Sequence, residues 1–137
     1  MVEAYISVGE VMTSEVITID RMATIRDAVA VIREKGVSSL VVERRDEADE
    51  FGMITVRDIA TQVVAEDKST ERTSVYEIMS KPIMTVPKDM NIMYAVRLLV
   101  RFGMTRAVVT DNNRMPCGIV TLRDMVVGSE RIRTGSD

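Results

Sequence analysis

The heptad GMITVRD at residues 52–58 returns as GIVTLRD at residues 118–124, and this repeat constrains the fold more than any other feature of the chain. Shifting the sequence by 67 residues also aligns SVGEVM (7–12) with SVYEIM (74–79), and one gap in a loop then reduces the shift to 66. Fifteen identical pairs spread over a whole unit are better explained by an internal duplication than by chance. The chain is therefore expected to fold as two similar units.

Each copy opens with the pattern of a short helical turn. Ser7 and Glu10 in the first copy, and Ser74 and Glu77 in the second, have the spacing of a capping box. In that motif the serine accepts from an orphan backbone N–H, and the glutamate reaches back to the serine's own N–H. Two short helices are therefore predicted, one at the start of each copy.

A strand and an amphipathic helix follow in each copy. The β-branched runs at residues 16–19 and 83–86 predict strands, and apolar residues then recur at helical spacing. Gly36 and Gly103 are expected to end these helices, since glycine adopts the left-handed conformation at little steric cost. The residues predicted to form the buried helix faces are Ile25, Ala28, Val29 and Ile32 in the first copy and Ile92, Ala95, Val96 and Leu99 in the second.

Two further strands and a second helix complete each copy. The apolar runs at 39–43 and 107–110 lead through polar turns, RRDEADE and DNNRMP, into the strand of each heptad. The last helix is expected to begin near Thr55 or Thr121, which makes each unit βαββα. One such unit has too little core to stand alone, so the predicted α/β (α+β) fold packs the sheets of two units together. The predicted boundaries are 7–64 for the first unit, 65–74 for a polar linker, 75–128 for the second unit and 129–137 for a tail.

Composition excludes several classes of function. No apolar run approaches the roughly 20 residues of a membrane-spanning helix, and the N-terminus does not resemble a signal peptide, so a cytoplasmic protein is expected. The absence of histidine rules out the usual zinc sites and histidine-based triads, and Cys117 is expected to be a small buried apolar residue. A net charge of -3 argues against broad nucleic-acid binding. Neither a metal site nor a catalytic residue is predicted.

The T-x-R-D part of each heptad has two interpretations. In the simpler one, Thr55 and Thr121 are N-caps, and Asp58 and Asp124 follow in the first turn, where the helix dipole favours a negative charge. In the other, the helix start binds a phosphate, helped by the threonine hydroxyl and the nearby arginine, while the aspartate accepts from both hydroxyls of a ribose. The residues alone leave both interpretations open, because a duplication copies whatever its ancestor contained.

The duplicated βαββα pattern, the helix-ending glycines before VSSLVV and MTRAVV, and the paired G-h-h-T-x-x-D stretches, where h is apolar, resemble a cystathionine β-synthase (CBS) domain pair. Such a pair is also called a Bateman module, and the resemblance covers residues 7 to about 128. It implies a regulatory module with two clefts between its packed units, commonly holding AMP, ADP, ATP or S-adenosylmethionine.

The resemblance also implies which residues contact the ligand. Ribose is expected on the aspartate and threonine of each heptad, adenine against the first strand, and phosphate on the residues after the helix-ending glycine. In this sequence the implied residues are Asp58, Thr55, Asp124 and Thr121 for ribose, Val16 to Thr18 and Ile83, Met84 and Thr85 for adenine, and Ser38, Ser39, Thr105 and Arg106 for phosphate.

The two copies are expected to bind unequally. Arg106 provides a planar cationic fork, whereas the aligned Ser39 provides only a hydroxyl. Arg57 and Arg123 have two interpretations, as further phosphate contacts or as solvated arginines at a helix start.

The predicted function is an adenosine-nucleotide sensor without catalysis of its own, which acts through ligand-dependent conformational change on a partner protein or on its own oligomer. The alternatives are a ligand-free interaction or dimerisation module, an S-adenosylmethionine-binding module and, least favoured, an adenylate-handling enzyme. From the resemblance we expect a homodimer formed through the first and last helices, with apolar faces at Val11/Met12 and Met125/Val126/Val127.

Overall fold

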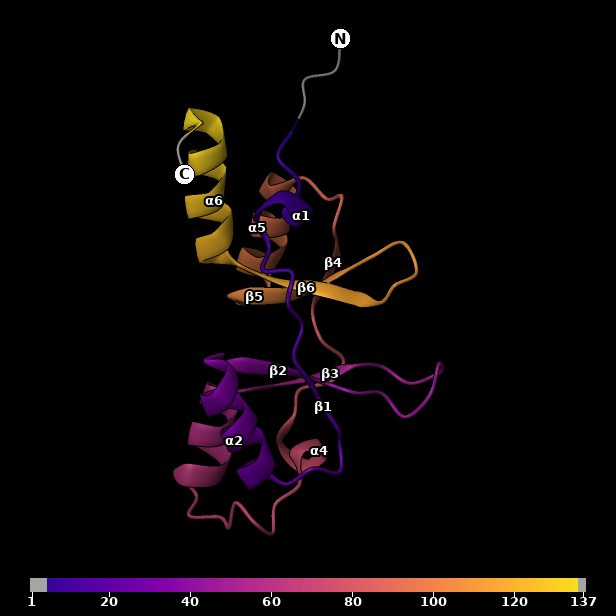
Figure 1. Ribbon diagram of the computed structural model, residues 1–137, viewed down its shortest axis with the longest axis vertical. Coiled ribbons are helices and arrows are strands. Elements are labelled where there is room, and N and C mark those ends of the chain that lie inside the picture. The colour runs from indigo at the N-terminus through magenta and orange to yellow at the C-terminus, as the bar shows by residue number, and fades with distance from the viewer. Residues whose placement is uncertain (1–4, 136–137) are drawn as a thin grey trace. The chain divides into compact units, whose positions relative to one another are not determined.

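The computed structural model describes residues 5–135, which fall into two compact units, each with its own three-stranded sheet (Figure 1). The first-repeat unit is Ile17–Ile83. The second-repeat unit combines Met1–Val16 with Met84–Asp137. Within residues 5–135, no helix has the length and apolarity needed to cross a membrane.

The first-repeat unit has the strand order β1-β2-β3, in which β1 runs parallel to β2 and β3 runs antiparallel to β2. Strand β1 is shorter than predicted from residues 16–19. The elements are β1 (Thr18–Ile19), α2 (Ile25–Lys35), β2 (Ser39–Val42), β3 (Gly52–Thr55), α3 (Val56–Ile59), the π-helix η1 (Ala60–Val64) and α4 (Val75–Ile78).

The second-repeat unit repeats this topology with the order β4-β5-β6, again one parallel and one antiparallel pair. The predicted mixed α/β fold, with two βαββα repeats, is confirmed. The elements are α1 (Val8–Val11), β4 (Thr85–Pro87), α5 (Ile92–Arg101), β5 (Arg106–Thr110), β6 (Pro116–Thr121) and α6 (Leu122–Thr134).

The predicted helix ends are confirmed. Gly36 ends α2 with φ 65°, and Gly103 adopts the same φ of 65° just after α5. This left-handed backbone lets the Met104 N–H donate to the Leu99 carbonyl at 2.8 Å, which satisfies one of the last carbonyls of α5.

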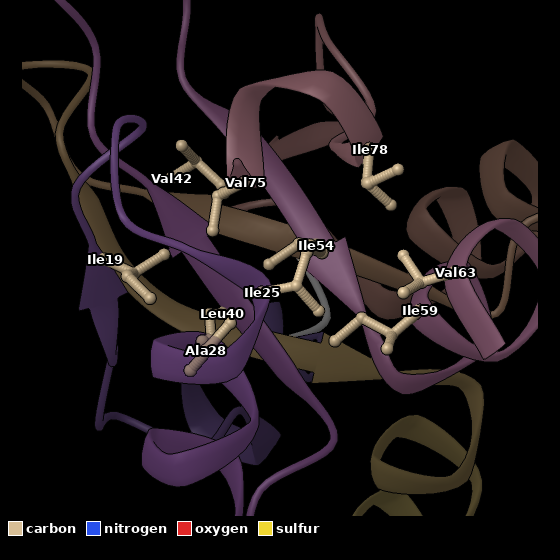
Figure 2. Close-up of a cluster of buried hydrophobic side chains, with 10 residues drawn as sticks. All are labelled: Ile19, Ile25, Ala28, Leu40, Val42, Ile54, Ile59, Val63, Val75 and Ile78. Carbon is tan, nitrogen blue, oxygen red and sulfur yellow. The ribbon is translucent and has the colours of Figure 1, made fainter. Parts of the chain in front are cut away.

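One apolar core lies between the helices and the sheet of each unit. Figure 2 shows the core of the first-repeat unit, where Ile25 and Ala28 of α2 face Leu40 of the sheet. Val29 was predicted to join this face, but its side chain is 42% exposed. The prediction fails because the buried stripe of α2 is narrower than its apolar residues suggest, whereas the aligned Val96 packs partly into the other core.

The opening helical turn of each repeat packs into the unit formed by the strands of the other repeat. The Val8 N–H of α1 donates to the Met90 carbonyl at 2.8 Å in the second-repeat unit. In the first-repeat unit, the Val75 N–H of α4 donates to the Ala23 carbonyl, also at 2.8 Å. The predicted capping boxes are present at both turns, since Glu10 and Glu77 each accept from the paired serine N–H at 2.7 Å.

This packing changes one expectation about exposed faces. Val11 and Met125 are buried, and Met12 is half-buried against the core of the second-repeat unit, because α1 packs against α6. Of the apolar face expected for a dimer, only Val126 and Val127 remain exposed.

The last helix differs between the repeats. In the second-repeat unit α6 is a regular helix of 13 residues that begins directly after Thr121, as predicted. In the first-repeat unit α3 has only 4 residues, Val56–Ile59, before the chain widens into the π-helix Ala60–Val64. The predicted start near Thr55 is confirmed, but the predicted single helix is not.

Candidate functional site

In the first-repeat unit, strand register brings several of the implied ligand contacts to one edge of the sheet, the edge at which β2 begins and β3 ends. Ser39 lies opposite Thr55 in the β2–β3 pair, and the Val56 N–H donates to the Ser38 carbonyl at 3.0 Å. The start of β2 therefore meets the start of α3. Thr18 lies opposite Val41, which is two positions after Ser39 in β2. Its hydroxyl donates to Glu43 at 3.3 Å.

The second-repeat unit builds the same edge from different residues. Arg106 lies opposite Thr121 in the β5–β6 pair, and the Leu122 N–H donates to the Thr105 carbonyl at 3.0 Å. Met84, the residue before β4, lies beside β5, because its carbonyl accepts from the Val108 N–H at 2.9 Å. Thr85 lies one position further along, opposite Val108, and is exposed.

The threonine and aspartate of each heptad form a reciprocal capping box. The Thr55 N–H donates to Asp58 Oδ2 at 2.9 Å, and the Asp58 N–H donates to Thr55 Oγ1 at 3.1 Å. The Thr121–Asp124 pair makes the same two bonds at 2.9 and 3.0 Å. The simpler interpretation of T-x-R-D, a helix cap, is therefore confirmed for both copies.

The cap leaves binding capacity unused. Within residues 5–135, Oδ1 of Asp58 and of Asp124 makes no hydrogen bond, and each threonine hydroxyl, which accepts in the cap, keeps its proton to donate. All four residues are half-buried, so part of each remains exposed. A capped helix start of this kind retains one carboxylate acceptor and one hydroxyl donor for a diol.

The remaining implied contacts divide by exposure. Arg57 and Arg123 are exposed beside the caps, and Ser38 and Thr105 are exposed after the helix-ending glycines. The half-buried contacts are Val16, Ser39, Ile83, Met84 and Arg106. Val16 precedes β1, and Ile83 and Met84 precede β4, so these three residues do not lie in the strands predicted for them.

The heptad glycines, Gly52 and Gly118, have a structural role that the sequence did not reveal. A Cβ on Gly118 would lie 2.5 Å from Met12 Sδ and 2.8 Å from the Thr13 carbonyl oxygen. A Cβ on Gly52 would lie 2.7 Å from Met79 Sδ and 3.2 Å from the Ser80 carbonyl oxygen. The sequence signal for this role was a glycine at the same place in both heptads. The role arises because the segment after each opening turn, which is distant in the chain, lies close to that glycine in space.

RRDEADE was predicted to be a polar turn, and one of its carboxylates is shielded from solvent. Only 8% of the Asp49 side chain is exposed, and its carboxylate pairs with Lys81 Nζ at 2.5 Å and Arg45 Nε at 3.2 Å. The Lys81 ammonium, with help from the Arg45 backbone N–H, holds the pKa of Asp49 well below its usual range. The ion pair between Asp49 and Lys81 therefore links the β2–β3 loop to the segment after α4.

No alternative chemical centre is apparent in residues 5–135. They contain no group of three or more Cys, Asp and Glu placed to hold a metal ion. Cys117 is half-buried in β6, and burial raises the pKa of its thiol, which disfavours the nucleophilic thiolate form. The duplicated caps remain the best candidates for binding.

Known proteins resemble this chain over most of its length. A family model of the CBS domain matches residues 8–65 and 75–128. An uncharacterised protein of Methanopyrus kandleri is 38% identical over 122 residues, which are 88% of this chain and 61% of the relative. A CBS domain-containing protein of Bacillus subtilis, YhcV, is 30% identical over 88% of this chain and 84% of its own. The chain thus spans less than two thirds of the length of the Methanopyrus kandleri relative.

Solved structures show the same fold. The hexameric CBS-CP12 protein from bloom-forming cyanobacteria superposes with a TM-score of 0.86 at 32% identity, covering 96% of this chain and 76% of that protein. The CBS domain pair of protein MJ0100, solved with 5′-methylthioadenosine and S-adenosyl-L-methionine, gives a TM-score of 0.76 at 23% identity, covering 96% and 98%. With two family matches on a duplicated fold, the chain belongs to the CBS domain family and contains a pair of CBS domains.

Proposed function

We propose that this CBS domain pair is a regulatory module that binds an adenosine nucleotide, AMP, ADP or ATP, at the duplicated caps. The observation that carries the proposal is the unused Oδ1 of Asp58 and Asp124 beside a threonine hydroxyl. A ribose presents two adjacent hydroxyls, and a carboxylate oxygen with a neighbouring hydroxyl is a suitable partner for that pair.

Polar groups at the same sheet edges favour a phosphorylated ligand. Arg106 at the second-repeat edge carries a guanidinium, which binds phosphate in a bidentate manner. Ser39 takes the corresponding place at the first-repeat edge, so we propose that the second-repeat edge binds phosphate more tightly. The structure of the MJ0100 pair with S-adenosyl-L-methionine supports a second candidate ligand, which has a ribose but no phosphate.

The proposed mechanism is a population shift without catalysis. A nucleotide that binds one conformation of the pair better than another shifts the equilibrium by its difference in affinity for the two. The response then passes to a partner protein or to the module's own oligomer. A relative of 32% identity is hexameric, and exposed Val126 and Val127 offer apolar contacts, so we propose self-association as a homodimer.

Titration calorimetry tests the ligand directly. AMP, ADP, ATP, S-adenosylmethionine and 5′-methylthioadenosine are titrated into nucleotide-free protein, and we expect one nucleotide to bind at micromolar strength, about -8 kcal/mol. Asp58→Ala and Asp124→Ala should each remove one site or weaken it strongly. Absence of binding by every ligand would contradict the proposal.

A matched variant separates ligand binding from capping. Asp27 caps α2 through the same bond, from the Thr24 N–H at 3.1 Å, but lies outside the candidate site. Asp27→Ala should therefore lower stability without changing affinity. Asp58→Asn keeps the shape of the cap and loses the charge, so weakened binding by this variant in folded protein assigns the carboxylate to the ligand.

A ligand-free interaction module is the second candidate function. The observation in its favour is that Thr55, Asp58, Thr121 and Asp124 are already engaged as caps, which would explain these residues without a ligand. It predicts no calorimetric signal with any adenosine compound and an oligomer that is unchanged by them. An enzyme would instead release product from ATP in a manner abolished by Asp124→Ala, and we expect no such turnover.

A further inference from the structure

The last helix of the first repeat widens soon after its cap. The Ala65 N–H donates to the Ala60 carbonyl, five residues earlier, at 2.9 Å, which is the hydrogen bond of a π-helix. The Thr61 hydroxyl donates to the Arg57 carbonyl at 2.9 Å, beside the start of the wide turn. Helix α6 follows an equivalent cap in the second-repeat unit and is α-helical throughout. The cap therefore does not itself require the π turn.

The two helices differ in the residue that meets the opening turn. In the second-repeat unit, a Cβ on the buried Gly128 of α6 would lie 2.8 Å from Val11 Cγ1 and 3.0 Å from Val11 Cβ, so a larger residue would displace α1. Shifting the sequence by 66 residues aligns Gly128 with Gln62, and a shift of 67 aligns Val11 with Ile78 of α4. A regular α-helix in the first repeat would therefore bring Gln62 against Ile78.

The π turn avoids this contact. Gln62 is exposed, whereas Val63 is fully buried, and Val63 and Ile78 both point into the core of the first-repeat unit (Figure 2). Ile59 and Val63 are the buried residues of this helix and lie four positions apart, but the buried pair of α6 lies three positions apart. The wide turn thus fits one more residue between the buried positions, and the Gln62 amide is not buried without a partner, which would be costly.

We propose that this π turn is a register switch, which the docking of α4 holds in its wide form. With α4 docked, the regular α form would bury Gln62 against it, so the π form is favoured. With α4 undocked, nothing penalises Gln62, and the commoner α form is favoured. The equilibrium between the two forms therefore follows the docking of α4.

The switch affects the chain that leads into the linker. Conversion from the π to the α form rotates the part after residue 62 by about 100° around the helix axis, the angle of one residue. The polar segment 65–74 continues from this part and ends where α4 begins. Helix α4 and the helix that carries Asp58 are thus coupled by packing as well as by the chain. The inference requires no ligand, so it stands or falls separately from the proposed nucleotide binding.

A single deletion tests whether the turn contains one residue more than the repeat needs. Deletion of Gln62 leaves Ile59 and Val63 three positions apart, as in α6, so we expect a folded chain that melts within about 5 °C of the parent. Deletion of Val127, which aligns with Thr61 in the regular helix α6, is the matched control. It rotates the rest of α6 by about 100° relative to its core, so we expect it to lower the melting temperature by more than about 10 °C or to prevent folding.

NMR couplings across hydrogen bonds report the register in the nucleotide-free chain. The parent should show a coupling between the Ala65 nitrogen and the Ala60 carbonyl carbon. Gln62→Gly, which imitates Gly128, should transfer this coupling to the carbonyl of Thr61, four residues before Ala65. Gln62→Ala is the matched control: its Cβ still meets α4, so the π coupling should remain.

A further variant tests the dependence on α4. Glu77 is exposed and accepts from the Ser74 N–H at 2.7 Å in the cap of α4, so Glu77→Ala weakens this helix without changing the π turn itself. We expect the Ala65 amide resonance to move toward its position in Gln62→Gly. An unmoved resonance, an Ala60 coupling retained in Gln62→Gly, or a deletion of Gln62 as damaging as that of Val127 would each overturn the inference.

Discussion

The two units contain the same cap in front of very different helices. Thr55 and Asp58 cap 4 residues of α-helix followed by a π-helix, whereas Thr121 and Asp124 cap a regular helix of 13 residues. The hydrogen-bond lengths of the two caps nevertheless agree within 0.1 Å. The candidate binding geometry is therefore a local property of T-x-x-D after a strand, and the packing around it is what distinguishes the units.

The packing difference is expected to be largest at the first residue of the long helices. Ile25 is fully buried at the start of α2, whereas the aligned Ile92 of α5 is only half-buried. Ile25→Ala should cost about 3 to 4 kcal/mol of unfolding free energy, toward the upper part of the range for buried isoleucine, and Ile92→Ala clearly less. Urea unfolding measures both. Equal costs would show that the two cores respond to truncation alike.

A smaller difference is expected at the heptad glycines. Gly118→Ala forces a Cβ against a carbonyl oxygen at 2.8 Å, but Gly52→Ala meets the corresponding oxygen at 3.2 Å, and the methionine in each case is flexible. Gly118→Ala should destabilise by about 2 to 3 kcal/mol and Gly52→Ala by about 1 kcal/mol. Thermal unfolding of the two variants checks the order. A greater loss at Gly52 would contradict the geometry of close approach.

The loss of ATP affinity on truncating the phosphate contact should differ between the two sites by about one order of magnitude. Arg106→Ala is expected to weaken ATP binding about tenfold, as the loss of a charge-assisted hydrogen bond implies, and Ser39→Ala much less. Binding of 5′-methylthioadenosine, which has no phosphate, should be affected by neither change. Calorimetry with both ligands provides the comparison. An equal loss for the two ligands would assign Arg106 to structure rather than to phosphate.

The smallest expected effect concerns the ion pair between Asp49 of the β2–β3 loop and Lys81. The pKa of Asp49 is lowered in the folded state, so its stabilisation is present above the unfolded carboxyl pKa, about 3.9, and is lost as pH falls through the folded value. Asp49→Asn should therefore be less stable than the parent at pH 7, with a difference that shrinks progressively below pH 4. Denaturation at several pH values measures this. A constant difference would exclude the carboxylate as its cause.

Short-range patterns predicted much of the fold and the helix caps on which the proposed site is built. The caps at Thr55 and Thr121, the left-handed Gly36 and Gly103, and the two βαββα repeats followed from residues close together in the chain. The exposure of Val29 did not follow, because periodicity identifies an apolar stripe but not the width that the sheet covers. The ion pair between Asp49 and Lys81 did not follow from local patterns either, since the two residues are 32 positions apart in the chain.

By itself, the sequence determined the duplication, the caps and the helix ends, because each depends on hydrogen bonds or backbone preferences that span a few residues. Tertiary structure alone decided that α1 completes the unit of the second repeat and α4 that of the first. It also decided which apolar residues of α5 and α6 remain uncovered as a groove. The reason is physical: local bonds form within a segment, whereas burial depends on which distant segment arrives to cover it.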